Sequence, residues 1–97
     1  MNPVATVSLQ VLPTVHKEKV FPIVDEVIAY IQSKGIPHVV GPLDTTMEGD
    51  LEVLLDVVRE AQYICTRNGA DGAISVVKIF YNVNGVNSIE EKIGKYR

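Results

Sequence analysis

The chain has 97 residues, of which 46% are hydrophobic, and its formal net charge is −3 at pH 7. This length suffices for one domain with one core, and the apolar content is too high for a disordered chain. The negative net charge argues against non-specific nucleic-acid binding, because displacing counterions from phosphates requires clustered Lys and Arg. We expect one globular domain over residues 1–97 that has no nucleic-acid partner.

The single cysteine, Cys65, excludes an internal disulfide and fits a reducing compartment. No signal peptide is evident at the N-terminus, and no apolar run approaches the ~20 residues needed to span a bilayer. We therefore expect a cytoplasmic protein without a membrane partner. The only basic cluster, Lys92, Lys95 and Arg97, closes the sequence and is interpreted as a solvated end.

The first half of the chain alternates between strand and helix periods. Residues 4–12 alternate apolar and polar side chains, which predicts a strand with one apolar face, and residues 14–17 form a loop. Residues 18–34 repeat apolar positions at three- and four-residue spacing, which predicts a helix ended by Gly35. Residues 36–42 and 45–48 are expected to be strands, with Met47 as the core residue of the second.

The second half repeats this order. Asp50 can cap a helix that runs to about Asn68, and residues 72–82 are rich in strand-forming side chains. A Ser-Ile-Glu-Glu capping signature begins a short helix over residues 88–96. The order β-α-β-β-α-β predicts an α+β ferredoxin-like sandwich, in which an antiparallel four-stranded sheet carries two helices on one face.

The last strand and the second helix carry more apolar surface than such a sandwich buries. The strand is apolar on both sides, with Ile74, Val76 and Phe80 on one and Val77, Ile79 and Tyr81 on the other. A strand with one solvated face alternates more cleanly. We infer that a second subunit covers part of the open sheet face, giving a homo-oligomer; the alternative is that the C-terminal segment folds back over it.

Polar side chains are expected to meet on that open face. Ser8 and Gln10 of the first strand and Thr46 and Glu48 of the third point away from the helices, and these two strands are central neighbours in this fold. Lys78 lies close by if it shares this side, and Phe80 and Tyr81 are candidate aromatic walls for a cationic guest. The alternative is an ordinary strand surface, with Glu48 solvated or paired to Lys78.

Signals for other chemistry are weak. The glycines are scattered and form no phosphate-binding loop, and no Ser-His-Asp or Cys-His arrangement can be assembled. His16 and His38 lack ligand spacing to Cys65, so no metal site is predicted, and Cys65 is interpreted as a core thiol. Asp44, Glu48 and Asp50 lie close together in the sequence, and a paired acid/base role is one interpretation of them. The alternative is that turn formation and helix capping explain Asp44 and Asp50.

Residues 41–50, Gly-Pro-Leu-Asp-Thr-Thr-Met-Glu-Gly-Asp, resemble a motif of small thiamine-binding proteins, with support from residues 7–13, 24–28 and 95–97. The resemblance covers nearly the whole chain. It implies a ferredoxin-like fold, subunits that associate through their sheets as dimers or tetramers, and binding of thiamine or its pyrimidine part by some members. Thr45, Thr46 and Glu48 match the characteristic motif, and Ser8 and Gln10 match its first strand.

These observations lead to one favoured function and two alternatives. The favoured function is non-catalytic binding of thiamine or a related aminopyrimidine, with no cofactor required. Glu48 then pairs with the amine or the cationic ring, and Ser8, Gln10, Thr45 and Thr46 provide hydrogen bonds. The alternatives are a small dimeric enzyme that uses Glu48 as a general acid or base, and a regulatory module that senses a metabolite.

Overall fold

The computed structural model describes residues 3–97. Its elements are β1 (Ala5–Pro13), α1 (Val20–Ser33), β2 (His38–Val40), β3 (Thr45–Gly49), α2 (Leu51–Arg67), β4 (Ala73–Tyr81) and α3 (Ile89–Ile93). One 3₁₀ turn, Lys17–Lys19, precedes α1, and another, Gly94–Tyr96, follows α3. Every predicted helix and strand is present.

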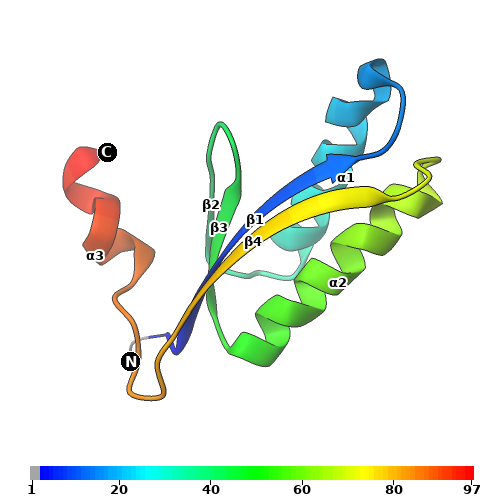
Figure 1. Ribbon diagram of the computed structural model, residues 1–97. Coiled ribbons are helices and arrows are strands. Elements are labelled where there is room, and N and C mark those ends of the chain that lie inside the picture. The colour runs from blue at the N-terminus through cyan, green and yellow to red at the C-terminus, as the bar shows by residue number, and fades with distance from the viewer. Residues whose placement is uncertain (1–2) are drawn as a thin grey trace.

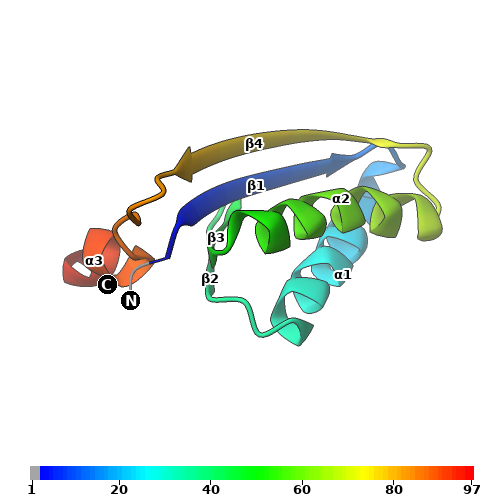
Figure 2. The same ribbon diagram turned by 90° about the horizontal axis from the view of Figure 1, so that it is seen from below.

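The strands form one antiparallel sheet in the order β2-β3-β1-β4. Helices α1 and α2 pack together against one face of it, as Figures 1 and 2 show. The short helix α3 lies on the other side of the β2–β3 pair from α1 and α2 (Figure 1). This arrangement is the α+β ferredoxin-like sandwich that the sequence predicts, with β1 and β3 as central neighbours.

The core lies between the sheet and the two long helices because the apolar face of each strand meets the apolar stripe of each helix. Val7 and Met47 are fully buried there, as is Leu54 of α2. The buried stripe of α2 includes Val57 and Ile64, whereas Leu55 is exposed. Cys65 is a buried core thiol, as predicted, and desolvation by burial raises its pKa.

The ends of the helices follow their local sequence signals to different extents. Gly35, which follows α1, has φ +67°, a conformation that glycine adopts without strain. Asp50 occupies the N-cap position of α2, but its side chain makes no capping hydrogen bond. The predicted capping box of α3 is complete: Ser88 Oγ accepts from the Glu91 backbone N–H at 3.1 Å, and Glu91 Oε1 accepts from the Ser88 N–H at 3.0 Å.

Within residues 3–97, no helix combines the length and hydropathy needed to cross a bilayer.

Candidate functional site

The open face of the sheet carries most of the predicted site residues in neighbouring positions. Ser8 lies opposite Thr46 on β3 and opposite Lys78 on β4. One step along the same face, Thr6 lies opposite Glu48 and Phe80. Directly opposed residues of an antiparallel pair point to the same side, so these six side chains share the face away from α1 and α2. Gln10, opposite Val76, extends the row.

Two predicted site residues lie on the other face. Thr45 pairs with Leu9, is 7% exposed, and points toward the helices. Tyr81 pairs with Ala5, which belongs to the core. Consecutive strand residues alternate between faces, so Thr45 cannot join Thr46, and Tyr81 cannot face the same site as Phe80. The expectation that these two residues share the site with the others is corrected on this ground.

Thr45 instead lines a separate hollow of about 200 Å³ formed by β1, the loop of residues 41–44 and α1. Its lining is largely apolar, and it includes the exposed side chains of Phe21 and Leu43.

The loop between β2 and β3 places a carboxylate over the open face. The Gly41 N–H donates to the Asp44 backbone carbonyl at 2.7 Å, which closes this loop. Ser8 Oγ then donates to Asp44 Oδ2 at 2.5 Å, across 36 residues of sequence. Asp44 is half-buried and borders every hollow described in this subsection. A residue that the sequence explains as a turn former is therefore the acidic group of the site.

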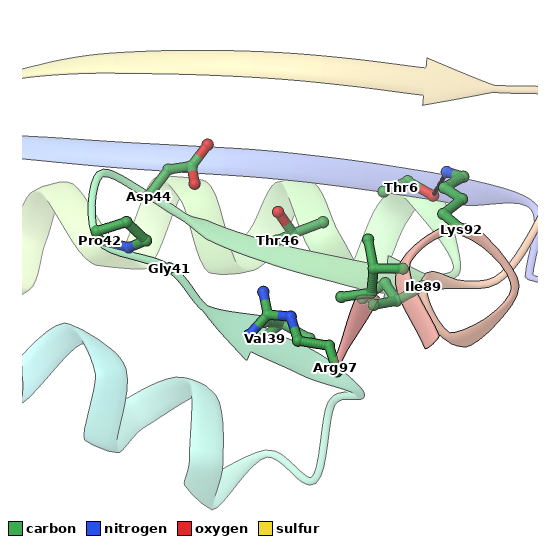
Figure 3. A pocket seen from close by; sticks show the side chains of 10 residues that line it. Thr6, Val39, Gly41, Pro42, Asp44, Thr46, Ile89, Lys92 and Arg97 are labelled. Atoms are coloured by element: carbon green, nitrogen blue, oxygen red, sulfur yellow. Dashed lines mark hydrogen bonds between the residues drawn. The ribbon is translucent and has the colours of Figure 1, made fainter. Parts of the chain in front are cut away.

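A cavity of about 220 Å³ lies between the open face and the C-terminal segment (Figure 3). Its lining comes from four parts of the chain: β1, the β2–β3 hairpin, α3 and the last residue. The lining residues are Thr6, Val39, Gly41, Pro42, Asp44, Thr46, Ile89, Lys92, Ile93 and Arg97. Only Thr46 of this set is among the predicted site residues.

Glu48 lies on the predicted face but has a structural partner there. Its Oε2 accepts a hydrogen bond from the Ile89 backbone N–H at 3.2 Å, at the first residue of α3. Glu48 does not line the cavity. No ion pair between Glu48 and Lys78 occurs within the described part of the chain, and the register places the two residues opposite different neighbours on β1.

The C-terminal segment covers part of the open face, as the alternative to a second subunit predicts. Lys92 Nζ donates to Thr6 Oγ1 at 3.3 Å and lies 5.2 Å from the centre of the Phe80 ring. Ile89 is buried beside the sheet. The interpretation of the basic tail as a solvated end is corrected for Lys92, which is half-buried and lines the cavity. Arg97 also borders the cavity, but it is exposed, as a solvated end predicts.

Beside this cavity, the open face carries a second and smaller hollow, separate from the one that Thr45 lines. It has a volume of about 160 Å³ and is lined by Ser8, Gln10, Leu43, Asp44, Val76 and Lys78. Asp44 therefore lies at the boundary between the two hollows. Ser8, Gln10 and Lys78 belong to this second hollow, whereas Thr46 belongs to the first. The predicted residues thus share a face but line two adjoining spaces.

Sequence patterns could identify some of the residues that the prediction omits. Thr6 occupies the same strand face as Ser8, so alternation alone places it beside the site. Asp44 lies within the motif of residues 41–50, but its position over Ser8 depends on how the hairpin loop folds. Nothing in the local sequence of residues 88–97 indicates that Lys92 reaches the first strand or that Arg97 borders the same cavity.

The first cavity offers groups for hydrogen bonding and for charge recognition in a small space. Asp44 provides a carboxylate that accepts hydrogen bonds, Thr6 and Thr46 provide hydroxyls, and Lys92 and Arg97 provide only donors. Apolar side chains of β2 and α3 complete the walls. A few converging polar groups within an apolar lining are typical of a small-molecule binding site.

The sequence is similar to that of a known protein family. The sequence profile of the thiamine-binding protein family matches residues 7–97. A UPF0045 protein of Clostridium perfringens is 50% identical over 91 residues, which cover 94% of this chain and 95% of the relative.

Solved structures show the same fold. A domain of unknown function from Bacillus cereus superposes with a TM-score of 0.87 at 41% identity. The match covers 96% of this chain and 89% of the Bacillus cereus chain. A Thermotoga maritima protein provisionally assigned to thiamine biosynthesis or salvage gives a TM-score of 0.85 at 35% identity. This match covers 96% of this chain and 98% of the Thermotoga maritima chain. The family profile and these relatives span nearly the whole chain, and the chain therefore belongs to the thiamine-binding protein family.

Proposed function

We propose that this protein binds thiamine or a related aminopyrimidine on the open face of its sheet, without chemically changing it. The observation that carries the proposal is the cavity beneath α3, where the Asp44 carboxylate and the Thr46 hydroxyl converge. Membership of the thiamine-binding protein family supports the ligand class. The Thermotoga maritima relative, whose assignment to thiamine biosynthesis or salvage is provisional, supports the same class.

In this proposal Asp44 recognises the exocyclic amine of the aminopyrimidine. A carboxylate accepts hydrogen bonds from an amine or from a protonated ring nitrogen, and a charged acceptor strengthens such bonds. Ser8 holds Asp44 in place through their 2.5 Å hydrogen bond. Thr46 adds a hydroxyl from the neighbouring strand, and Gln10 extends the polar surface into the adjoining hollow. Glu48 instead stabilises the start of α3, since its carboxylate accepts a hydrogen bond from the Ile89 backbone N–H.

The size of the cavity favours the pyrimidine part of thiamine over the whole molecule. Sites for drug-sized ligands usually have volumes of about 300–1,000 Å³. The cavity has about 220 Å³, which suits one substituted ring. The adjoining hollow of about 160 Å³ offers space for a second ring beyond Asp44.

The test is isothermal titration calorimetry with thiamine and with 4-amino-5-hydroxymethyl-2-methylpyrimidine. The wild-type protein should bind at least one of them, and Asp44→Asn should weaken binding by at least about tenfold, because the amide loses the charge. Asp71→Asn is the matched control, since it removes the same charge from an exposed loop on the opposite end of β1. Absence of binding at near-millimolar ligand, or equal loss in both variants, would contradict the proposal.

We also propose that a second copy of the chain covers the part of the open face that α3 leaves exposed. Leu12, Ile74, Val76 and Phe80 share that face by register, and their exposed fractions are 46%, 68%, 48% and 52%. A contiguous exposed apolar surface is typical of a protein interface. A dimer or tetramer assembled through this face would also enclose the hollow that Lys78 lines.

A further inference from the structure

Strand β4 lies at one edge of the sheet, and alternate backbone groups along it point away from β1. At the two ends of the β1–β4 ladder, the Asn82 N–H donates to the Val4 carbonyl, and the Thr14 N–H donates to the Gly72 carbonyl. The register between these ends is unbroken, so the even-numbered residues of β4 bond to β1 and the odd-numbered ones point outward. The outward-pointing residues are Ala73, Ser75, Val77, Ile79 and Tyr81.

This edge lacks the features that usually prevent pairing with another strand. Such features are proline, charged side chains, bulges and short strand length. Strand β4 has nine residues, no proline, no bulge against β1 and one charge, Lys78. The opposite edge, β2, has only three residues and lies between Pro37 and Pro42. Figure 2 shows β4 along the upper rim of the sheet, with no other segment of residues 3–97 beyond it.

Side chains on both faces of β4 are exposed beside this edge. Ile79 and Tyr81 lie opposite core residues of β1 and point to the helix side, but they are 51% and 52% exposed. Phe80, on the open face, is 52% exposed. A second copy placed over the open face covers Phe80 but leaves Ile79 and Tyr81 in solvent. A strand that pairs with the edge contacts side chains on both faces.

We propose that β4 pairs antiparallel with β4 of a second copy, about a two-fold axis at Val77, and so joins the two sheets into one. The proposal concerns a different surface from the open face and does not depend on the ligand. A two-fold interface uses the same patch on both copies, and this strand is complementary to itself. Centred on Val77, all nine residues of each strand pair, and the outward groups of one copy meet those of the other.

The charges on β4 favour this register over its neighbour. Centring on Val77 places Lys78 opposite the partner's Val76. Centring on Lys78 would instead place two lysines directly opposite each other, which is destabilising. Val76 lines the hollow that also contains Ser8, so the partner's Lys78 lies at the rim of that hollow in the favoured register. Each copy then contributes a residue to the other copy's open face.

Hydrogen–deuterium exchange resolved by residue tests the pairing in the wild-type protein. The amides of Val77 and Ile79 should exchange at least about fivefold more slowly in the assembled than in the dissociated protein, as a typical hydrogen bond gives. The amides of Val76 and Lys78 are the internal control, because they already donate to β1 and should change little. Assembly through the open face alone would give no such difference between odd and even positions.

Cysteine cross-linking tests the register. The Cα atoms of a hydrogen-bonded antiparallel pair are about 5.5 Å apart, which a disulfide can span, so Val77→Cys should form a covalent dimer on mild oxidation. Ile79→Cys is the matched control, because the two copies of position 79 are offset by four residues, or roughly 14 Å along the strand. Cys65 is buried and common to both variants. Circular dichroism reports whether each variant is folded.

Each of three results would overturn the inference. The first is equal exchange at Val77 and Ile79 in the assembled and dissociated protein, and the second is equal cross-linking of the two cysteine variants. Both leave assembly through the open face intact. The third is a wild-type protein that light scattering shows to be a monomer, and this result removes both interfaces. Aminopyrimidine binding is measured separately, so its absence would contradict the proposed function and not this pairing.

Discussion

Asp44 and Glu48 are four residues apart in one motif, but their carboxylates occupy different environments. Asp44 accepts from Ser8 and borders the cavity, whereas Glu48 accepts from the backbone of Ile89 and lies outside the lining. The difference follows from the backbone: Asp44 is in the hairpin loop, and Glu48 is on β3 next to the start of α3. Ligand recognition is therefore expected to depend on Asp44, and positioning of α3 on Glu48.

Replacing Glu48 should release α3 rather than remove a ligand contact. Glu48→Ala deletes the acceptor of the Ile89 N–H, which costs about 1 kcal/mol for a typical hydrogen bond. We expect faster hydrogen–deuterium exchange at the Ile89 amide and a small decrease in the free energy of unfolding. Glu48→Gln keeps an oxygen acceptor and should preserve much of the protection.

The opposite pattern would restore the role that the sequence predicts for Glu48. If Glu48→Ala abolished aminopyrimidine binding while exchange at Ile89 stayed unchanged, this carboxylate would be the direct partner of the amine.

At the scale of elements, α3 is the shortest α-helix of the described chain and therefore has the least intrinsic helical stability. It spans only Ile89–Ile93, and isolated helices of this length do not persist in water. Its stability depends on the Ser88 capping box, on Glu48 and on the burial of Val86 and Ile89. Local capping and long-range contacts are both needed, because neither alone orders so short a helix.

Ser88→Ala should loosen α3 without affecting the sandwich. Loss of an N-cap side chain typically costs about 1 kcal/mol, and here the released segment carries Lys92. We expect faster amide exchange within residues 89–93, with protection of α1 and α2 unchanged. Ser33→Ala is the control, because its hydroxyl bonds to an exposed carbonyl at the end of α1. Equal exchange in both variants would show that the capping box does not stabilise α3.

At the scale of the whole molecule, the sheet has one face covered by α1 and α2 and another covered only in part by α3. The remaining apolar side chains lie mainly along β4, where Ile74 is 68% exposed. Burial of such surface stabilises an assembly by roughly 25 cal/mol per Å² of apolar area, before the costs of association are subtracted. A second copy of the chain is the proposed cover.

Introducing a charge on that face should dissociate the assembly. We expect light scattering to give a dimer or tetramer for the wild-type protein and a smaller species for Ile74→Lys, because an ammonium cannot be buried without a partner. Phe21→Lys is the control, since Phe21 is 79% exposed on the helix side of the molecule. A monomeric wild-type protein, or dissociation by Phe21→Lys alone, would contradict assembly through the sheet.

Alternation and helical period account for what the sequence by itself determined. They assigned the order of elements, placed Met47 in the core, and put Ser8, Thr46 and Glu48 on the open face, because the direction of a strand side chain depends only on its position along the strand. The same rule separates Thr45 from Thr46 and Tyr81 from Phe80 once the faces are assigned. Thr45 was included in the site because of the motif, and Tyr81 because it is an aromatic neighbour of Phe80.

Tertiary structure alone decided where the loop and the C-terminal segment lie. The Ser8–Asp44, Glu48–Ile89 and Thr6–Lys92 hydrogen bonds join residues 36, 41 and 86 positions apart. Periodicity describes neighbours within one element, and contacts over these separations depend on how the elements pack. The sequence therefore determined which side chains share the open face, and the packing of the hairpin loop and α3 against that face determined which groups line the cavity.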